Sequence, residues 1–369
     1  MRASVAGATL ILTVFAGPGL GACAIASQTP AETRPADTQT NAAPSSATAL
    51  PRVRLVATGG TISNRSGGRL TAEELVATLP GLERYVRPEF EQFANVASGS
   101  LTLKQWIELA NRINTLFTDD GELSGIVVTS GTDTLEEMAY FLDLTVRSEK
   151  PVVVVGSMRN PSTLGYEGAA NLLEAYRVAA DPASRGKGVV VVLNDEINAA
   201  RDVTKTDAHR LDTFQSREYG ILGVVDSDRV VYYRDVVKRH THNSEFDVSR
   251  IEALPRVDVV LTYQGATGDI IKGVVDQGAK GIVIAGAGAG ATSGTQEEGI
   301  RYAVDKGVVV VITTRTGGGR VAARSRGAGS PALQIQGEDL APLKARILLM
   351  LALTRTQDTS VIQRMFSEY

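Results

Sequence analysis

Residues 53–63, which read V-R-L-V-A-T-G-G-T-I-S, decide the fold. Apolar residues at positions 53, 55 and 57 alternate with other side chains, as in a short β-strand. Gly59 and Gly60 follow and allow a tight turn that a Cβ atom would hinder. The turn leaves the Thr61 hydroxyl at the carboxyl end of the strand, where open α/β sheets bind their ligands. Because short Gly/Thr motifs have low specificity, an ordinary strand-to-loop turn is the alternative interpretation.

A second Gly-Thr pair also follows an apolar run. Residues 126–130 read I-V-V-T-S and lead into G-T-D-T at 131–134. Residues 135–142 then fit an amphipathic helix, which Thr132 or Thr134 could cap and whose first turn carries two glutamates that suit its positive end. Gly-Thr therefore occurs twice, each time after a predicted strand.

A third stretch, R-D-V-T-K-T-D at residues 201–207, follows the strand predicted at 189–193 and places a lysine in a polar loop. With these three stretches the chain resembles the bacterial L-asparaginases, specifically the secreted type II asparaginase/glutaminase group, from about residue 51 to 369. The motifs that carry the resemblance are, in chain order, A-T-G-G-T-I at 57–62, G-T-D-T-L-E-E at 131–137, K-P-V-V at 150–153, V-G-S-M-R at 155–159 and R-D-V-T-K-T at 201–206.

The resemblance implies an α/β fold with two α/β domains and mostly parallel sheets, the N-terminal domain being the larger. It implies hydrolysis of L-asparagine to L-aspartate and ammonia through a threonine acyl-enzyme, with weaker glutaminase activity, no cofactor and no metal. It also implies a homo-oligomer, a tetramer of paired dimers. Amide hydrolysis needs a nucleophile, a base and donors for the oxyanion.

By the same resemblance, Thr61 is the nucleophile, and Thr132 is a second essential threonine linked to Asp133 and Lys205. Lys205 would orient a threonine and take its proton, while backbone N–H groups around both threonines hold the oxyanion. Ser98 would bind the substrate α-carboxylate, and Asp133 would face the α-ammonium. The residues implied in substrate binding are Gly60, Ser98, Gly99, Gly131 and Ser157.

Four positions depart from the family pattern. Residues 63–70 contain no tyrosine, although many secreted members carry a lid tyrosine after the first motif. Gly99 replaces a glutamine, Arg320 stands where some members have an acid, and Gly265 replaces an asparagine contributed across the subunit interface. The nucleophile set is intact, so these departures bear on substrate preference and affinity.

Several alternatives stay open at this point. Taken singly, Asp133 is more typical of a helix start than of an active site, and Lys205 is more typical of a solvated loop. A non-catalytic amino-acid-binding lipoprotein with the same fold is one alternative, which the intact catalytic set disfavours. An amidotransferase subunit acting on charged tRNA is another. The net charge of −3 and the absence of a basic block disfavour any nucleic-acid partner.

The first 50 residues have the composition of an exported protein. A positive start precedes an apolar run at residues 5–17 that is too short to span a bilayer, and L-G-A-C then ends at Cys23 like a bacterial lipobox. We expect a signal peptide at residues 1–23, lipidation of Cys23, a flexible linker at 24–50, and a periplasmic or lipid-anchored protein. The small residues at 22–24 and 24–26 offer an alternative, in which the leader is cleaved without lipidation. Cys23 is the sole cysteine, so the mature body has neither a disulfide nor a thiol nucleophile.

The rest of the chain is long enough for two domains with alternating strands and helices. We expect a catalytic domain at residues 51–240, a polar connector at 241–255 and a second α/β domain at 256–369 that ends in a long helix at 339–353. Capping boxes start helices after Thr71 and Thr102. The run G-A-G-A-G at 286–290 is interpreted as a tight loop, because no acid closes the next strand as a dinucleotide site requires. The three histidines suit no zinc pattern.

Overall fold

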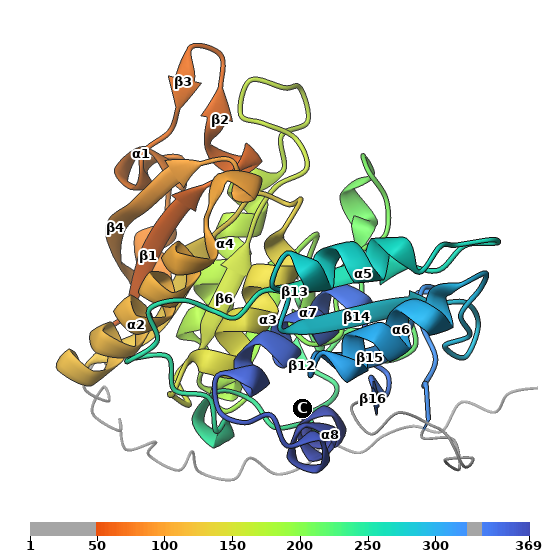
Figure 1. Ribbon diagram of the computed structural model, residues 1–369. Helices are drawn as coiled ribbons and strands as arrows, with labels where there is room; N and C mark the ends of the chain where they lie inside the picture. The colour runs from red at the N-terminus through yellow and green to blue at the C-terminus, as the bar shows by residue number, and fades with distance from the viewer. Residues whose placement is uncertain (1–48, 323–333) are drawn as a thin grey trace, which may run out of the picture. The chain divides into compact units, whose positions relative to one another are not determined.

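In the computed structural model, which describes residues 49–322 and 334–369, strand β1 (Arg52–Gly59) is part of an eight-stranded sheet with the order β12-β11-β8-β7-β6-β5-β1-β4 (Figure 1). Strands β4, β1, β5, β6 and β7 pair in parallel, and β8, β11 and β12 extend the sheet antiparallel. The expected mostly parallel sheet is confirmed. The other seven strands are β4 (Arg87–Val96), β5 (Leu123–Thr129), β6 (Val152–Val155), β7 (Val189–Leu193), β8 (Glu196–Ala199), β11 (Gly223–Val225) and β12 (Val230–Tyr232).

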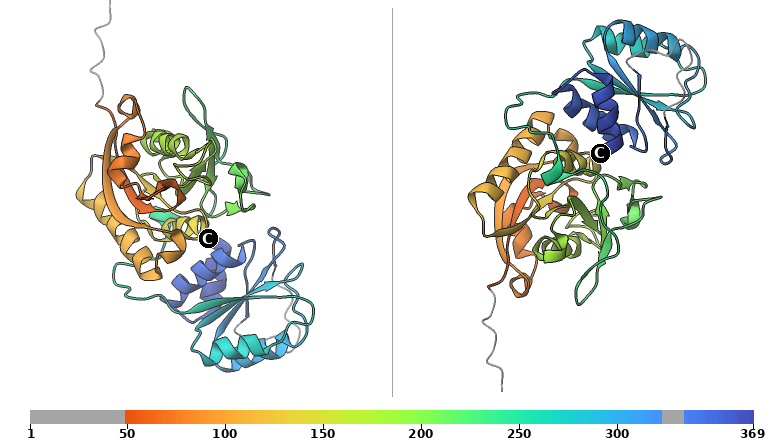
Figure 2. Two further views of the ribbon diagram at one scale, coloured as in Figure 1. Left: turned by 90° about the horizontal axis from the view of Figure 1, so that it is seen from above. Right: turned by 90° about the horizontal axis from the view of Figure 1, so that it is seen from below.

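Helices cover both faces of this sheet because successive side chains of a buried strand point to opposite faces (Figure 2). Val53 and Leu55 of β1 pack in a core with the helices α1 and α4, whereas Val56 packs in a separate core with α2 and α3. The capping boxes predicted at Thr71 and Thr102 are present and start α1 and α2. These helices are α1 (Ala72–Ala77), α2 (Leu103–Asp119), α3 (Leu135–Thr145) and α4 (Gly168–Ala180).

The C-terminal part has a second, four-stranded sheet, order β13-β14-β15-β16, in which all pairs are parallel. The expected two-sheet α/β fold is thus present. Its strands are β13 (Val257–Leu261), β14 (Gly281–Gly286), β15 (Val309–Thr314) and β16 (Gln334–Gln336), and its helices are α5 (Asp269–Asp276), α6 (Gln296–Asp305), α7 (Pro342–Leu353) and α8 (Thr359–Glu368). The G-A-G-A-G run forms the expected tight loop, since Ala287 and Ala291 exchange two backbone hydrogen bonds of 2.8 Å.

The C-terminal end differs from the expected single helix at 339–353. Helix α7 begins at Pro342, and a further helix, α8, follows it. The N-cap of α8 is Asp358, whose carboxylate accepts hydrogen bonds from the backbone of Ser360 and Val361. The sequence D-T-S at 358–360 therefore contained a helix start that was missed.

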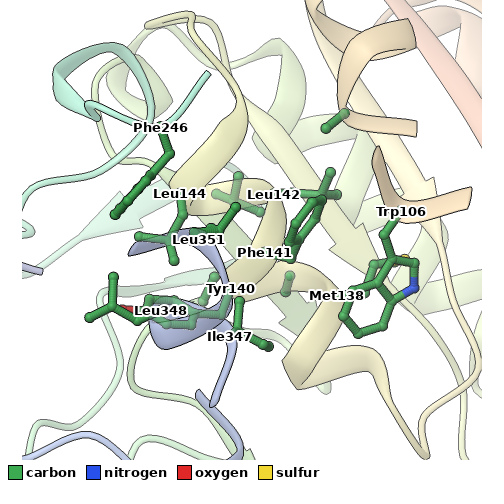
Figure 3. Packing of buried hydrophobic residues seen from close by; sticks show 14 of the residues in the cluster. Trp106, Met138, Tyr140, Phe141, Leu142, Leu144, Phe246, Ile347, Leu348 and Leu351 are labelled. Carbon is green, nitrogen blue, oxygen red and sulfur yellow. The ribbon is translucent and has the colours of Figure 1, made fainter. Parts of the chain in front are cut away.

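Helix α7 is apolar on nearly all sides, as expected of a helix that is buried between α3 and the second sheet. One hydrophobic cluster contains residues of the first sheet, of α3 and α7, and of the second sheet. Figure 3 shows Tyr140 of α3 lying beside Leu348 and Ile347 of α7. The ring centroids of Phe141 and Trp106 are 5.7 Å apart, so Trp106 is a core residue as predicted.

Two short hairpins complete the described structure: β2 (Asn64–Arg65) with β3 (Gly68–Arg69), and β9 (Thr204–Lys205) with β10 (Phe214–Gln215). Six 3₁₀ turns occur among the described residues: η1 (Thr61–Ser63), η2 (Leu82–Arg84), η3 (Ser98–Ser100), η4 (Pro182–Ser184), η5 (Leu211–Thr213) and η6 (Thr241–Asn243). Within residues 49–322 and 334–369, no helix has the length and apolar character needed to cross a bilayer. Cys23 lies outside the described residues.

Candidate functional site

The two Gly-Thr motifs meet at the carboxyl edge of the first sheet. Strands β1 and β5 are parallel neighbours, with Ala57 opposite Thr129, so the loops that follow them start side by side. Gly60 has φ 93°, and a Cβ built on it would overlap the backbone nitrogen of Gly131. Only glycine fits this close approach. The next residues along the two loops are Thr61 and Thr132.

Thr61 opens the turn η1 and is partly exposed, whereas the following Ile62 and Ser63 are buried. The residue before the turn is held at three points. The Gly60 N–H donates to the Val96 carbonyl (2.9 Å), and the Gly60 carbonyl accepts from Ser63 Oγ (3.0 Å) and from Arg69 Nη1 (3.1 Å). The Thr61 residue is thus presented on a short, braced turn at the end of β1.

Lys205 joins the second Gly-Thr motif. Its Nζ lies 3.0 Å from Thr132 Oγ1 and 2.9 Å from Asp133 Oδ1. Thr132 is 5% exposed and the Lys205 side chain 17%, whereas the Asp133 side chain is 83% exposed. The amine is therefore within proton-transfer distance of a hydroxyl in a nearly dry setting, while the aspartate remains open to a ligand from solution.

The backbone around Lys205 is fixed by the same motif that supplies its hydroxyl partner. Lys205 pairs with Phe214 in the β9–β10 hairpin, and its N–H donates to Glu136 Oε1 (3.2 Å). Glu136 is buried in the first turn of α3, so it serves as a hydrogen-bond acceptor as well as a helix-start acid. Thr134 occupies the N-cap position of α3, as one of the two predicted caps, but its side chain makes no capping hydrogen bond.

Of the residues predicted to bind substrate, Gly60, Ser98 and Gly131 lie together. Ser98 is buried in η3, and a Cβ added to Gly131 would lie 2.8 Å from its Oγ. Gly99 is exposed, with no other atom within 4 Å of the place where its Cβ would be. Because Gly99 has no side chain, the space beside Ser98 at the edge of the candidate site is open.

Ser157 lies in the loop after β6 and is fully buried. Its hydroxyl donates to the carbonyl of Arg159 (2.6 Å), so this side chain is used within its own loop. The preceding Gly156 is near the candidate site, because a Cβ on it would be 3.4 Å from Thr132 Cγ2. The Ser157 side chain therefore does not contact the candidate site, and it is the preceding residue, Gly156, that lies next to Thr132.

Two residues that depart from the family pattern have local explanations in the structure. The Arg320 guanidinium pairs with Glu338. Gly265 has φ 74°, a conformation that favours glycine, and its N–H donates to Ser293 Oγ (3.0 Å). In residues 49–322 and 334–369, no cluster of three or more His, Cys, Asp and Glu side chains is placed to hold a metal.

Two residues in contact with these loops were missed in the sequence. Tyr166 Oη donates to the carbonyl of Ile62 (2.9 Å), and Lys344 Nζ donates to the carbonyls of Ala200 and Arg201, four to five residues before Lys205. Tyr166 lies outside every motif, so nothing in the sequence pointed to its contact. Lys344 could have been identified, because a lysine inside an otherwise apolar helix needs buried hydrogen-bond partners.

Comparisons with known proteins agree with this arrangement. Residues 52–238 match the model "Asparaginase, N-terminal", and residues 256–366 match "Glutaminase/Asparaginase C-terminal domain". L-asparaginase 2 of Bacillus subtilis is 44% identical over 330 residues, which is 87% of each chain. The glutaminase-asparaginase of Pseudomonas fluorescens is 37% identical over 333 residues, covering 87% of this chain and 91% of the relative.

A solved structure extends the comparison to three dimensions. The crystal structure of a probable cytoplasmic L-asparaginase from Campylobacter jejuni superposes with a TM-score of 0.82 at 38% identity, covering 86% of this chain and all of that one (100%). The two family models together match most of the chain, and the structural match covers 86% of it. The chain therefore belongs to the asparaginase family.

Proposed function

We propose that the protein is an amidohydrolase that converts L-asparagine to L-aspartate and ammonia through a threonine acyl-enzyme, with weaker activity on L-glutamine. One observation carries the proposal: Lys205 Nζ contacts Thr132 Oγ1 and Asp133 Oδ1, next to the contact between Gly60 and Gly131. Relatives named L-asparaginase and glutaminase-asparaginase support the choice of substrates.

In the proposed acylation step, Thr61 Oγ1 attacks the carbonyl carbon of the side-chain amide. The new C–O bond forms as the C–N bond breaks, and the hydroxyl proton passes to the nitrogen, which leaves as ammonia. Thr132 and Lys205 carry that proton between the hydroxyl and the leaving group. Water then attacks the ester, which releases the aspartate carboxylate and restores Thr61. Backbone N–H groups around Thr61 and Thr132 stabilise the oxyanion in both steps.

The proposed binding mode fixes the amino-acid head of the substrate. Asp133, the most exposed member of the set, pairs with the α-ammonium, and Ser98 donates to the α-carboxylate. Gly60, Gly131, Gly99 and Ser157 contribute space and backbone groups around the side-chain amide. The chemistry uses groups of the chain alone, without a cofactor.

Replacement of the nucleophile tests the proposal. We predict that Thr61→Ala lowers kcat for asparagine by about three orders of magnitude or more, since removing a nucleophile leaves only binding and oxyanion stabilisation. Ammonia release measures the rate, and thermal unfolding checks the fold. Thr118→Ala, at an exposed threonine of α2, is the matched control and should be fully active. Wild-type turnover by a folded Thr61→Ala protein would show that Thr61 is not the nucleophile.

We also predict a preference for asparagine over glutamine. With Asp133 and Ser98 holding the head, one extra methylene moves the amide carbon away from Thr61, and a displacement near 1 Å costs about a hundredfold in rate. Residues 63–70 contain no tyrosine and Gly99 has no side chain to correct the pose or exclude water, so affinity should also be weaker than in members with a tyrosine lid. The test is to measure kcat/KM for asparagine and for glutamine on one preparation of the enzyme. Equal values, or a higher value for glutamine, would contradict the prediction.

For the assembly, we propose a homotetramer of paired dimers in which a neighbour completes each site, and an exported protein anchored through lipid on Cys23. The L-G-A-C run supports the anchor, and a Haemophilus influenzae relative is named "Probable L-asparaginase periplasmic". Sedimentation at assay concentrations tests the assembly, since a fully active monomer excludes a shared site. Mass spectrometry of the mature N-terminus tests lipidation.

A further inference from the structure

The loop between β6 and α4, residues 156–167, touches the segment that contains Thr61 at two points. Tyr166 Oη donates to the carbonyl of Ile62 (2.9 Å), inside the turn η1. Ser162 Oγ accepts the N–H of Ser66 (2.9 Å), in the β2–β3 hairpin that follows this turn. Figure 1 shows this hairpin and the loop beyond β6 side by side at one end of the sheet. The turn and the hairpin therefore have a common support outside their own segment.

The β6–α4 loop is itself braced. The Glu167 carboxylate accepts the N–H groups of Met158 and Arg159, and Arg159 Nη1 donates to the carbonyl of Gly165 (3.0 Å). Within the loop, Asn160 Oδ1 accepts from the backbone of Ser162 (2.9 Å). These bonds join both ends of the loop, so a side chain fixed to it has a defined position.

The Tyr166 ring is also held by packing near its hydroxyl end. It is partly buried against the start of α4, where a Cβ on Gly168 would overlap the ring and its hydroxyl. Burial raises the pKa of Tyr166, so the hydroxyl stays protonated and remains a donor over the whole neutral range. Aromatic side chains have only two rotatable bonds, so little entropy is lost when such a ring is fixed.

We propose that Tyr166 is a positioning residue for the nucleophile: its hydrogen bond to the Ile62 carbonyl fixes the turn η1, and through it the direction in which Thr61 Oγ1 points. The proposal rests on the role of Thr61 proposed above. Tyr166 acts through Ile62 and needs no contact with substrate. A small rotation of the turn would move Oγ1 off the line of attack, to which rates are steeply sensitive.

The chain offers a matched pair of variants. Tyr166→Phe removes one hydroxyl that binds the turn. Tyr176→Phe removes a hydroxyl from the adjacent helix α4 that has no hydrogen-bond partner among the described residues. We expect Tyr166→Phe to lower kcat about three- to thirtyfold, since it loses one hydrogen bond and the alignment that depends on it. KM should stay within about twofold because the amino-acid head is bound elsewhere, and Tm should be nearly unchanged.

The control and the outcomes separate this proposal from the function on which it rests. Tyr176→Phe should keep wild-type kcat and KM. Unchanged kcat in Tyr166→Phe, or an equal loss in both variants, overturns the positioning role while leaving the amidohydrolase intact if Thr61→Ala is inactive. A loss of kcat that appears only together with a lower Tm or a lower folded fraction also overturns it, because the bond would then serve stability alone. A wild-type protein without amide hydrolysis overturns both proposals.

Discussion

At the residue scale, Asp143 is a buried carboxyl on α3 whose ionisation is coupled to stability. Burial raises the pKa of Asp143 to about 7, although its carboxylate accepts the N–H of Val189 (2.8 Å). In the unfolded chain the same carboxyl group has the ordinary pKa of an aspartate, about 3.9. The folded state therefore binds the extra proton between these two values, and its stability falls as the pH rises through that range.

We predict that the wild-type protein loses stability between pH 5 and pH 8, relative to Asp143→Asn, by about 2 kcal/mol. Asparagine keeps an oxygen for the Val189 N–H but does not titrate. Burial lowers the pKa of the nearby His240, which gives the opposite slope, but this group is present in both proteins and cancels. Urea unfolding of both proteins at the two pH values provides the measurement. Parallel pH profiles would show that Asp143 does not carry the dependence.

At the element scale, helix α7 clamps the segment that leads to Lys205. Lys344 is 1% exposed, and its Nζ donates to the carbonyls of Ala200 (2.8 Å), Arg201 (2.8 Å) and Val203. An ammonium has three donors, and here each has a carbonyl partner. A helix from the C-terminal part of the chain thus fixes the backbone of a catalytic loop in the N-terminal part.

Removing this clamp should affect both stability and rate. We predict that Lys344→Met costs about 2–4 kcal/mol, because three buried carbonyls lose their donor, and lowers kcat roughly tenfold by loosening the loop before Lys205. Arg346→Met is the control, since Arg346 lies on the same helix and donates to Val257 of the second sheet. Arg346 also forms an ion pair with Glu137 of α3 (3.7 Å), and neither of these partners belongs to the backbone that leads to Lys205. This variant should lose stability without losing kcat per folded enzyme. If both variants have the same kcat as the wild type, the hydrogen bonds of Lys344 do not influence the position of Lys205.

The features predicted correctly from the sequence are those that depend on near neighbours. Alternating apolar residues gave the strands, and side chains three residues apart gave the capping boxes at Thr71 and Thr102. The supports of the candidate site lie far apart along the chain. The bonds of Glu136, Tyr166 and Lys344 span 69, 104 and up to 144 residues, so no local pattern contains them. The motif residues themselves were identified through the resemblance.

At the scale of the whole molecule, the two sheets share one core, and polar contacts reinforce it. Arg201 of the first part pairs with Asp339 of the second (2.7 and 3.2 Å), and Tyr219 Oη donates to the same carboxylate (2.6 Å). Residues 241–255, which the sequence predicts to be a connector, are also packed: Phe246 is buried, and its ring centroid lies 5.1 Å from that of Tyr369. Neither part can separate without exposing α7 or α3 to water.

We therefore predict that both parts unfold in one cooperative transition, although chains of this length often unfold in steps. Opening the two parts would expose the apolar residues of α7, at about 25 cal/mol for each Å² of apolar surface, which disfavours a half-folded intermediate. Trp106 is the only tryptophan, so its fluorescence reports on the α2–α3 layer, while far-UV circular dichroism reports on both sheets. The two denaturant curves should coincide at every concentration. An additional circular dichroism step without a fluorescence change would mean that the second sheet unfolds by itself and that the shared core is too weak to couple the two parts.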